Sequence, residues 1–204
     1  MKMGIKAKVG DVFLIPLDKS SCVGGQVVSI RDDDELYLAV FGQLLSRNEI
    51  DPEVATSGAP RLLGLSFDAK LWHGHWPIIG NLIEKVGDYP QPNYKVRRAG
   101  QLYLQSRDLT VNRPATDEEA EALEYRTVSD AAVIADAIKA TLGITEWNEH
   151  YDDLHADKAI ASAKLLWAPE SAKHSLSQIT ILLPNYGDTV TLWLTPKPKC
   201  ILSH

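Results

Sequence analysis

The sequence predicts an α+β fold, in which a β-rich first half is followed by helices and a C-terminal β-hairpin. Short apolar runs separated by polar turns recur between residues 10 and about 105, as in antiparallel strands. Apolar residues then recur at helical spacing between residues 116 and about 167. Two further strand-like runs follow, so strands and helices are segregated along the chain as in α+β proteins.

The first three strands are expected to form a meander with short polar links. Their apolar runs are Val12–Leu17, Cys22–Ile30 and Leu36–Phe41. Asp18–Ser21 and Arg31–Glu35 supply turn residues between them. Gly24 and Gly25 interrupt the second run, and glycines inside a strand are typical of a bulge or a bend. We therefore expect a strongly bent antiparallel sheet or a partial β-barrel in the N-terminal half.

Residues 46–105 are expected to complete this β-rich part. Residues 46–60 are polar and include two prolines, which predicts a loop. The strands expected after it are Leu62–Phe67 and Gln101–Gln105. Because strand side chains alternate between faces, Leu63, Leu65 and Phe67 should share one face.

Residues 67–81 form the densest aromatic stretch of the chain. Trp72 and Trp76 flank the pair His73 and His75. We expect this stretch to close one strand, turn tightly and return into the core, with both histidines at the turn. In an extended segment the two histidines would face the same way, as metal ligands can. A structural zinc site takes four ligands, however, so we expect no metal and no cofactor here.

The two cysteines and the N-terminal residues indicate in which cellular compartment the protein is expected. Cys22 and Cys200 lie far apart in sequence, and we expect both to be free thiols. Residues 1–10 lack the apolar run of a signal peptide. No stretch approaches the roughly 18 apolar residues of a membrane span. A cytoplasmic protein without a membrane partner is therefore expected.

The sequence of the second half of the chain predicts three helices. Thr116 and Glu119 match a capping box at the start of a short acidic helix. Ser129 is expected to cap the second helix, Gly143 to end it, and Asp157 to open the third. The expected inward positions are Ile134, Ile138 and Leu142 in the second helix, and Ile160, Ala163 and Leu166 or Trp167 in the third.

The last two strands and the linkers define the expected domain organisation. Ile179–Leu183 and Val190–Leu194 predict a β-hairpin around a polar turn. No flexible linker separates the two halves of the chain. We therefore expect one domain over residues 1–204, with a β-rich core at 1–112 and the acidic helices and hairpin at 113–204.

The charge of the chain is concentrated in its second half. Residues 1–100 carry twelve lysines and arginines and twelve aspartates and glutamates. Residues 101–204 carry nine of the former and fifteen of the latter, so the whole net charge of −6 lies there. Binding of a nucleic acid requires a basic surface, so this acidic excess argues against a nucleic-acid partner. An acidic surface instead suits a basic protein partner.

Two acidic segments, 117–124 and 146–157, are the candidate partner-binding surfaces. The residues expected to bind a partner are Glu118, Glu121, Glu146, Trp147, Glu149, Tyr151, Asp152 and Asp153. Aromatic side chains often anchor protein interfaces, so Trp147 or Tyr151 is the expected anchor. Clustered acids alone more often form a solvated face.

The acidic segment 146–157 also contains residue types that could form a catalytic site. If residues 146–157 are helical, Glu146 and Glu149 share a face with His150 and Asp153. The segment matches neither the HExxH pattern nor the spacing of an EF-hand. The chain also lacks a GxSxG elbow, a phosphate-binding P-loop and a GxGxxG fingerprint after a strand. We therefore expect no enzyme and name no catalytic residue.

Three short motifs follow one another in the first half. They are GDVFLIPL at Gly10–Leu17, GQVV at Gly25–Val28 and WPIIGN at Trp76–Asn81. Their order and spacing, within residues 6–105, resemble the immunity protein 26 family of bacterial polymorphic toxin systems. The resemblance implies a small cytoplasmic protein that binds and neutralises a cognate toxin domain, as in contact-dependent inhibition. We expect Phe13, Ile15, Trp76 and Ile78 to be core residues.

Charge supports this interpretation and leaves two alternatives open. Many antibacterial toxins are nucleases with basic grooves, and an acidic inhibitor complements such a surface. One alternative is a metal-dependent hydrolase that uses His73 and His75 with acids of the second half. The other is a small-barrel adaptor that binds a peptide between Trp72, Trp76 and Tyr37.

Overall fold

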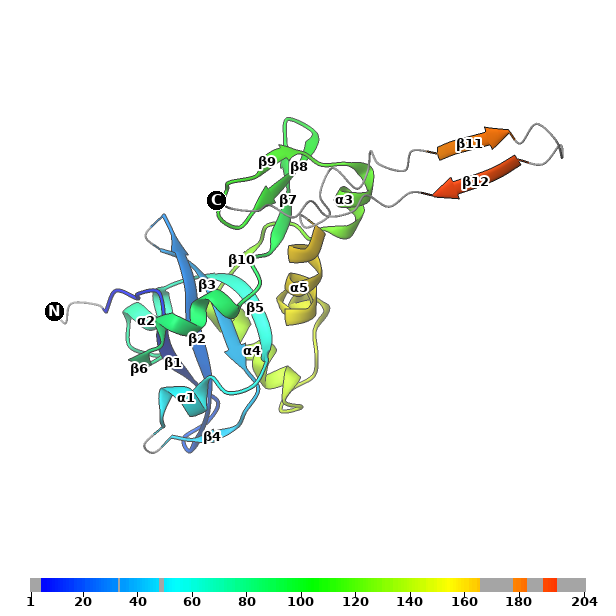
Figure 1. The fold of residues 1–204 in the computed structure, drawn as a ribbon. Helices are drawn as coiled ribbons and strands as arrows, with labels where there is room; N and C mark the ends of the chain where they lie inside the picture. The colour runs from blue at the N-terminus through cyan, green and yellow to red at the C-terminus, as the bar shows by residue number, and fades with distance from the viewer. Residues whose placement is uncertain (1–4, 33, 48–49, 166–177, 183–188, 194–204) are drawn as a thin grey trace, which may run out of the picture. The chain divides into compact units, whose positions relative to one another are not determined.

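The computed structural model of the chain describes residues 5–32, 34–47, 50–165, 178–182 and 189–193. Its backbone contacts divide the chain into two units, Met1–Ala163 and Lys164–His204, which are described separately. In the second unit β11 (Gln178–Leu182) pairs antiparallel with β12 (Thr189–Trp193), as the sequence predicts (Figure 1). That residues 1–204 form one domain stays a prediction.

Seven strands form one sheet in the first unit (Figure 1). They are β1 (Asp11–Pro16), β2 (Ser21–Arg31), β3 (Glu35–Phe41), β4 (Leu45–Ser46), β5 (Pro60–Phe67), β6 (Ile78–Asn81) and β10 (Val128–Ser129). Their order is β10-β5-β3-β2-β1-β6, with β4 paired to β2. Every pair is antiparallel except β10 with β5. The α+β class and the initial meander are therefore confirmed.

A three-stranded sheet and several short helices complete the described structure. The second sheet contains β7 (Asn93–Arg98), β8 (Gln101–Ser106) and β9 (Asn112–Pro114). The helices are α1 (Pro52–Ala55), α2 (Ala69–Trp72), α3 (Asp117–Ala122), α4 (Ala131–Thr141) and α5 (Ala156–Leu165). Two 3-10 segments are η1 (Ile83–Asp88) and η2 (Glu149–Leu154). None of these helices is long and apolar enough to cross a membrane.

The seven-stranded sheet is open and does not curl into a barrel. Within the described residues its edge strands β6 and β10 pair only with β1 and β5. The prediction of a strongly bent sheet or a partial barrel, based on Gly24 and Gly25, is therefore wrong. Both glycines stay in regular register with β1, and the irregularity of β2 lies between Val27 and Ser29. An extra residue, not glycine, disturbs the ladder.

Close packing explains the two glycines. A Cβ on Gly24 would lie 1.9 Å from the carbonyl oxygen of Ala55 in α1. A Cβ on Gly25 would lie 2.5 Å from the ring of Phe13. Both positions therefore allow other groups to touch the strand backbone.

The strand β3 is buried on both faces, so the sheet lies between two apolar clusters. Alternate residues of β3 enter one cluster with Leu38 and the other with Tyr37. Helix α4 covers the first cluster through Ile134 and Ile138, as the spacing predicts. Helix α5 contributes Ala159 to the second. A strand with two buried faces reads as a continuous apolar run, which is the pattern of residues 36–41.

The start of α3 is confirmed, whereas that of α4 differs by one residue. Thr116 and Glu119 form both hydrogen bonds of the capping box. Asp130 caps α4, and its carboxylate accepts a hydrogen bond from the N–H of Ala132. The expected cap, Ser129, is still part of β10 and pairs with β5.

Helix α5 turns small side chains toward the sheet. Its buried residues are Ala156, Ala159 and Ser162. The predicted inward positions Ile160 and Ala163 are only half-buried, so this prediction is wrong. Small side chains let the helix backbone approach the strand closely, and the neighbouring N–H of Asn93 donates to the Ser162 hydroxyl. Leu166 and Trp167 lie outside the described residues.

The aromatic stretch contains the helical turn α2, and the expected turn follows it at His73 and Gly74, where Gly74 has a φ of 69°. After β5 the chain forms α2 and returns through β6 beside β1. Trp76 is buried and stacks on Phe13, with ring centroids 5.3 Å apart. Trp72 is 43% exposed and Phe67 is 49% exposed. Phe67 does not join the buried face of Leu63 because it ends β5, opposite Glu35 at the start of β3.

Some expectations concern residues that the structure does not describe. Cys22 is buried and free, whereas Cys200 lies outside the described residues. The predicted hairpin turn falls at residues 183–188, which are also outside. Only the pairing of β11 with β12 can therefore be compared with the prediction.

Replacing Gly24 with alanine tests the close approach of α1. Gly24→Ala is expected to lower the free energy of unfolding by about 1 to 3 kcal/mol, the usual cost of overpacking. The new methyl group meets a backbone oxygen, which cannot rotate away as a side chain can. Gly87→Ala is the matched control, because a Cβ there meets no atom within 4 Å. Urea denaturation measures both, and equal stabilities would contradict the packing argument.

Candidate functional site

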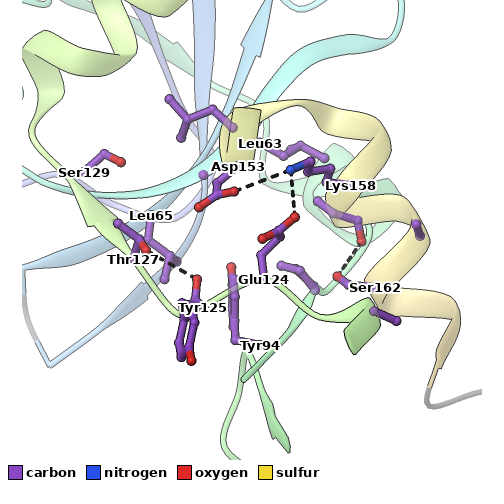
Figure 2. Close-up of a pocket in the computed structure, with 16 residues that line it drawn as sticks. Leu63, Leu65, Tyr94, Glu124, Tyr125, Thr127, Ser129, Asp153, Lys158 and Ser162 are labelled. Carbon is purple, nitrogen blue, oxygen red and sulfur yellow. Dashed lines mark hydrogen bonds and ion pairs between the residues drawn. The ribbon is translucent and has the colours of Figure 1, made fainter. Parts of the chain in front are cut away.

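A cavity of about 280 Å³ opens beside α5 in the first unit (Figure 2). Its floor is apolar and includes Leu63, Leu65 and Leu154. Tyr94 and Tyr125 form an aromatic wall. An apolar hollow with a few polar groups at its edge is the usual form of a binding site.

Three charged side chains meet at this cavity (Figure 2). The Lys158 ammonium lies 2.7 Å from a carboxylate oxygen of Glu124 and 3.5 Å from one of Asp153. Two carboxylates therefore share one ammonium, and one negative charge is left over. Because these side chains are each about two-fifths exposed, the excess charge is available to a ligand.

The pKa values reflect this crowding of carboxylates. Burial raises the pKa of Asp153, the charge of Glu124 raises it further, and Lys158 lowers it. The pKa of Lys158 is raised mainly by its hydrogen bond to Glu124. Asp153 is thus a carboxylate whose ionised form is disfavoured by its surroundings, which is common at binding sites.

Apolar contacts hold Asp153 in place. The next residue, Leu154, is 4% exposed and packs over Gly64 of β5, where a Cβ would lie only 2.4 Å from a Leu154 methyl group. His155 then forms a bridge to Leu62. Segment η2 is therefore fixed to the sheet immediately beside the charged group.

Exposed apolar side chains lie on the residues before η2. Ile144 is 56% exposed and Trp147 is 36% exposed, within a continuous exposed run over residues 143–150. We call Ile144, Glu146, Trp147 and Glu149 the Trp147 surface. Apolar groups among charged ones are the composition of a protein interface.

The indole of Trp147 is held despite its exposure. Its N–H donates to a carboxylate oxygen of Asp152 at 2.8 Å. Its ring stacks on His155 at a centroid distance of 4.3 Å and meets the ring of Tyr151 edge-on at 5.4 Å. Such an anchor loses little conformational freedom when a partner binds.

The structure brings the two predicted acidic segments together. Glu124 ends one segment and Asp153 belongs to the other, and Lys158 joins them. Of the predicted partner-binding residues, Glu146, Trp147, Glu149, Tyr151, Asp152 and Asp153 lie on or beside η2. Glu118 and Glu121 lie exposed on α3.

The structure adds two details to the predicted surface. Residues 149–154 form a 3-10 segment, so the α-helical face considered for Glu146, Glu149, His150 and Asp153 is not formed. Tyr151 and Asp152 are half-buried and serve to hold Trp147. The pairing of Glu124 with Lys158 has no signal in the sequence, since 34 positions separate the two residues.

The alternative sites predicted from aromatic and histidine residues are not assembled. His73 and His75 are exposed with ring centroids 6.0 Å apart, and the described residues contain no group of three or more potential metal ligands. Trp76 lies in one apolar cluster and Tyr37 in the other, on opposite faces of the sheet. Trp72, Trp76 and Tyr37 therefore do not line a common groove.

Comparisons with protein-family models, curated proteins and solved structures gave no match. The resemblance to the immunity protein 26 family therefore stays a prediction. Its three motifs occupy the neighbouring strands β2, β1 and β6, where Val12 lies opposite both Gln26 and Gly80. Phe13, Ile15 and Trp76 are buried. Ile78 is partly buried against them, so the motifs form part of the core.

Neutralising Asp153 should change the pH dependence of stability. Because its pKa is raised in the folded protein, its contribution is full at low pH and is lost as pH rises through the folded pKa. Asp153→Asn should therefore gain stability relative to the native protein as pH rises above about 4. Urea denaturation from about pH 3 to pH 7 measures this, with the exposed Glu146→Gln as control. A difference that does not vary with pH would contradict the assignment.

Proposed function

We propose that this chain is an immunity protein that binds and neutralises a basic toxin domain of a bacterial polymorphic toxin system. The observation that carries the proposal is the convergence of both acidic segments on one apolar cavity, with an excess carboxylate at its edge. The motifs that resemble the immunity protein 26 family give the class of partner. On this proposal the protein acts in the cytoplasm, without a cofactor and without catalysis.

The chemistry of the site supports a folded basic partner. The Trp147 surface offers an apolar centre between carboxylates, and Trp147 is already held by Asp152. Charged groups around an apolar centre steer a partner of opposite charge and fix its register. A nuclease domain, which must carry basic groups to hold phosphate, is the toxin class that fits.

The raised pKa of Asp153 supports the same conclusion. In the free protein, its ionised form is opposed by burial and by Glu124. A lysine or arginine from a partner would neutralise the pair of carboxylates. Binding would then offset the loss of stability that the free protein incurs by holding Asp153 ionised beside Glu124.

The primary experiment is co-expression with a toxin domain. The test partner is the inactivated C-terminal domain of a large secreted protein encoded beside this gene. A stoichiometric complex, together with rescue of growth when the active domain is expressed, is the expected result. Absence of both complex and rescue would overturn the proposed function.

Charge reversal locates the binding surface. The double variant Glu146→Lys and Glu149→Lys should slow association and weaken binding by about tenfold or more, because both side chains are exposed on the Trp147 surface. Trp147→Ala should cost about 2 kcal/mol or more as an interface anchor. The matched control is Glu84→Lys with Asp88→Lys, which reverses two exposed acids on η1. Calorimetric titration measures the affinity of each variant for the toxin domain. Equal loss of affinity in both double variants would place the interface elsewhere.

A further inference from the structure

Three arginines surround one buried glutamate where β2 meets β3. Arg126 Nη2 and Arg107 Nη1 both approach one carboxylate oxygen of Glu35, the latter at 3.5 Å. Arg31 Nη2 lies 3.3 Å from the other oxygen. The three arginines come from β2, from the residue after β8 and from the segment before β10. We call these four residues the arginine cluster.

The arginine cluster holds more positive than negative charge in a buried place. The side chains of Glu35, Arg107 and Arg126 are only 8%, 3% and 9% exposed. Asp32 lies 3.0 Å from Arg31 Nε, but it is 76% exposed and neutralises only the outer edge. Burying unbalanced charge is costly, because the protein interior screens it poorly.

Unsatisfied hydrogen-bond donors are concentrated at the same place. Among the described residues, the buried side-chain nitrogens and oxygens without a hydrogen bond are Ser29 Oγ, Arg31 Nε, Arg107 Nε, Arg107 Nη2 and Arg126 Nη1. Arg31 Nε has the ion pair with Asp32 but no hydrogen-bond geometry to it, whereas the atoms of Arg107 and Arg126 have neither. Ser29 lies opposite Tyr37 in the β2–β3 ladder, and the Arg107 guanidinium lies 5.8 Å from the Tyr37 ring. All five atoms therefore belong to one region. Buried polar groups elsewhere in proteins are almost always paired, so this concentration needs an explanation.

We propose that the arginine cluster binds a small dianionic oxyanion such as phosphate. A dianion would balance the two positive charges that Glu35 leaves over. Its oxygens would accept hydrogen bonds from Arg107 and Arg126, whose planar guanidinium groups suit oxyanions. The aromatic faces of Tyr37 and Tyr94, beneath Arg107 and Arg126, limit the position that the anion can take.

The electrostatic state of Arg107 agrees with a missing negative charge. Burial lowers its pKa from the ordinary value, and Arg126 and Arg31 lower it further. Glu35 and Tyr94 act in the opposite direction. The net direction is downward, so one carboxylate does not compensate the burial of this guanidinium.

The route of entry is at Arg31. Its side chain is 26% exposed, whereas the donors of Arg107 and Arg126 are closed to solvent. Binding therefore requires Arg31 to exchange its contact with Asp32 for one with the anion. Asp32 competes with the anion, and this competition can be tested independently of the toxin-binding proposal.

Calorimetric titration of the full chain with phosphate at constant ionic strength is the test. Saturable binding is expected, and its absence would overturn the proposal. Arg31→Gln should weaken phosphate binding by about tenfold or more, the effect of losing one charge-assisted hydrogen bond. Arg98→Gln is the matched control, since Arg98 is an exposed arginine over a tyrosine ring outside the cluster. Equal weakening by both variants would also overturn it.

A second variant changes affinity in the opposite direction. Asp32→Asn should tighten phosphate binding, because it removes the competing carboxylate from Arg31. Asparagine tolerates the left-handed backbone of this position, where φ is 51°, so folding is preserved. Weaker binding by Asp32→Asn would contradict the proposal. A crystal grown with selenate should show an anomalous peak beside Arg107 and Arg126, and ordered water there instead would overturn it.

Discussion

Both faces of the central sheet must be covered, and the rest of the first unit depends on this constraint. Strand β3 alternates residues such as Leu38 and Tyr37 between two apolar clusters, and each is almost fully buried. Burial of each large apolar side chain contributes about 1.5 to 3 kcal/mol, so neither face can be left to water. The meander of β1, β2 and β3 cannot cover itself. Helices α4 and α5, from far along the chain, therefore have to lie on opposite faces.

The candidate binding site follows from this covering. Leu154 and Ala159 are buried against the sheet, and their immediate neighbours Asp153 and Lys158 line the cavity. Each apolar residue fixes the backbone, and the adjacent charged residue is thereby positioned. Gly64 allows Leu154 to approach β5 closely enough for this. Stability and site geometry thus depend on the same contacts.

The sequence was sufficient where one local interaction decides the structure. The capping box of Thr116 and Glu119 and the apolar spacing of Ile134 and Ile138 depend on neighbours within one helix, and both are confirmed. Prediction from the sequence failed where groups distant in the chain determine the local structure. Glycines inside a strand, such as Gly24 and Gly25, are compatible with either a bend or a close contact with another group. Only the positions of Ala55 and Phe13 in the folded protein show that the close contact is the reason here.

The candidate site shows the same limit. The acidic segments can be recognised from composition, and Trp147 or Tyr151 can be named from the sequence as a candidate anchor. The pairing of Glu124 with Lys158 could not, because it arises only when α5 packs on the sheet. The 3-10 form of η2 likewise has no periodic signal that distinguishes it from an α-helix over so few residues.

Among the described residues of the second half, burial removes more cations than carboxylates from the surface. Of the nine basic residues after position 100, Arg107 and Arg126 are withdrawn into the arginine cluster. Glu119 is the buried carboxylate of the same half, paired with Arg113. Removing two cations and one carboxylate leaves a larger negative excess on the other residues of that half. The buried arginines and the acidic candidate site are neighbours, because Tyr94 lies under Arg126 and also lines the cavity.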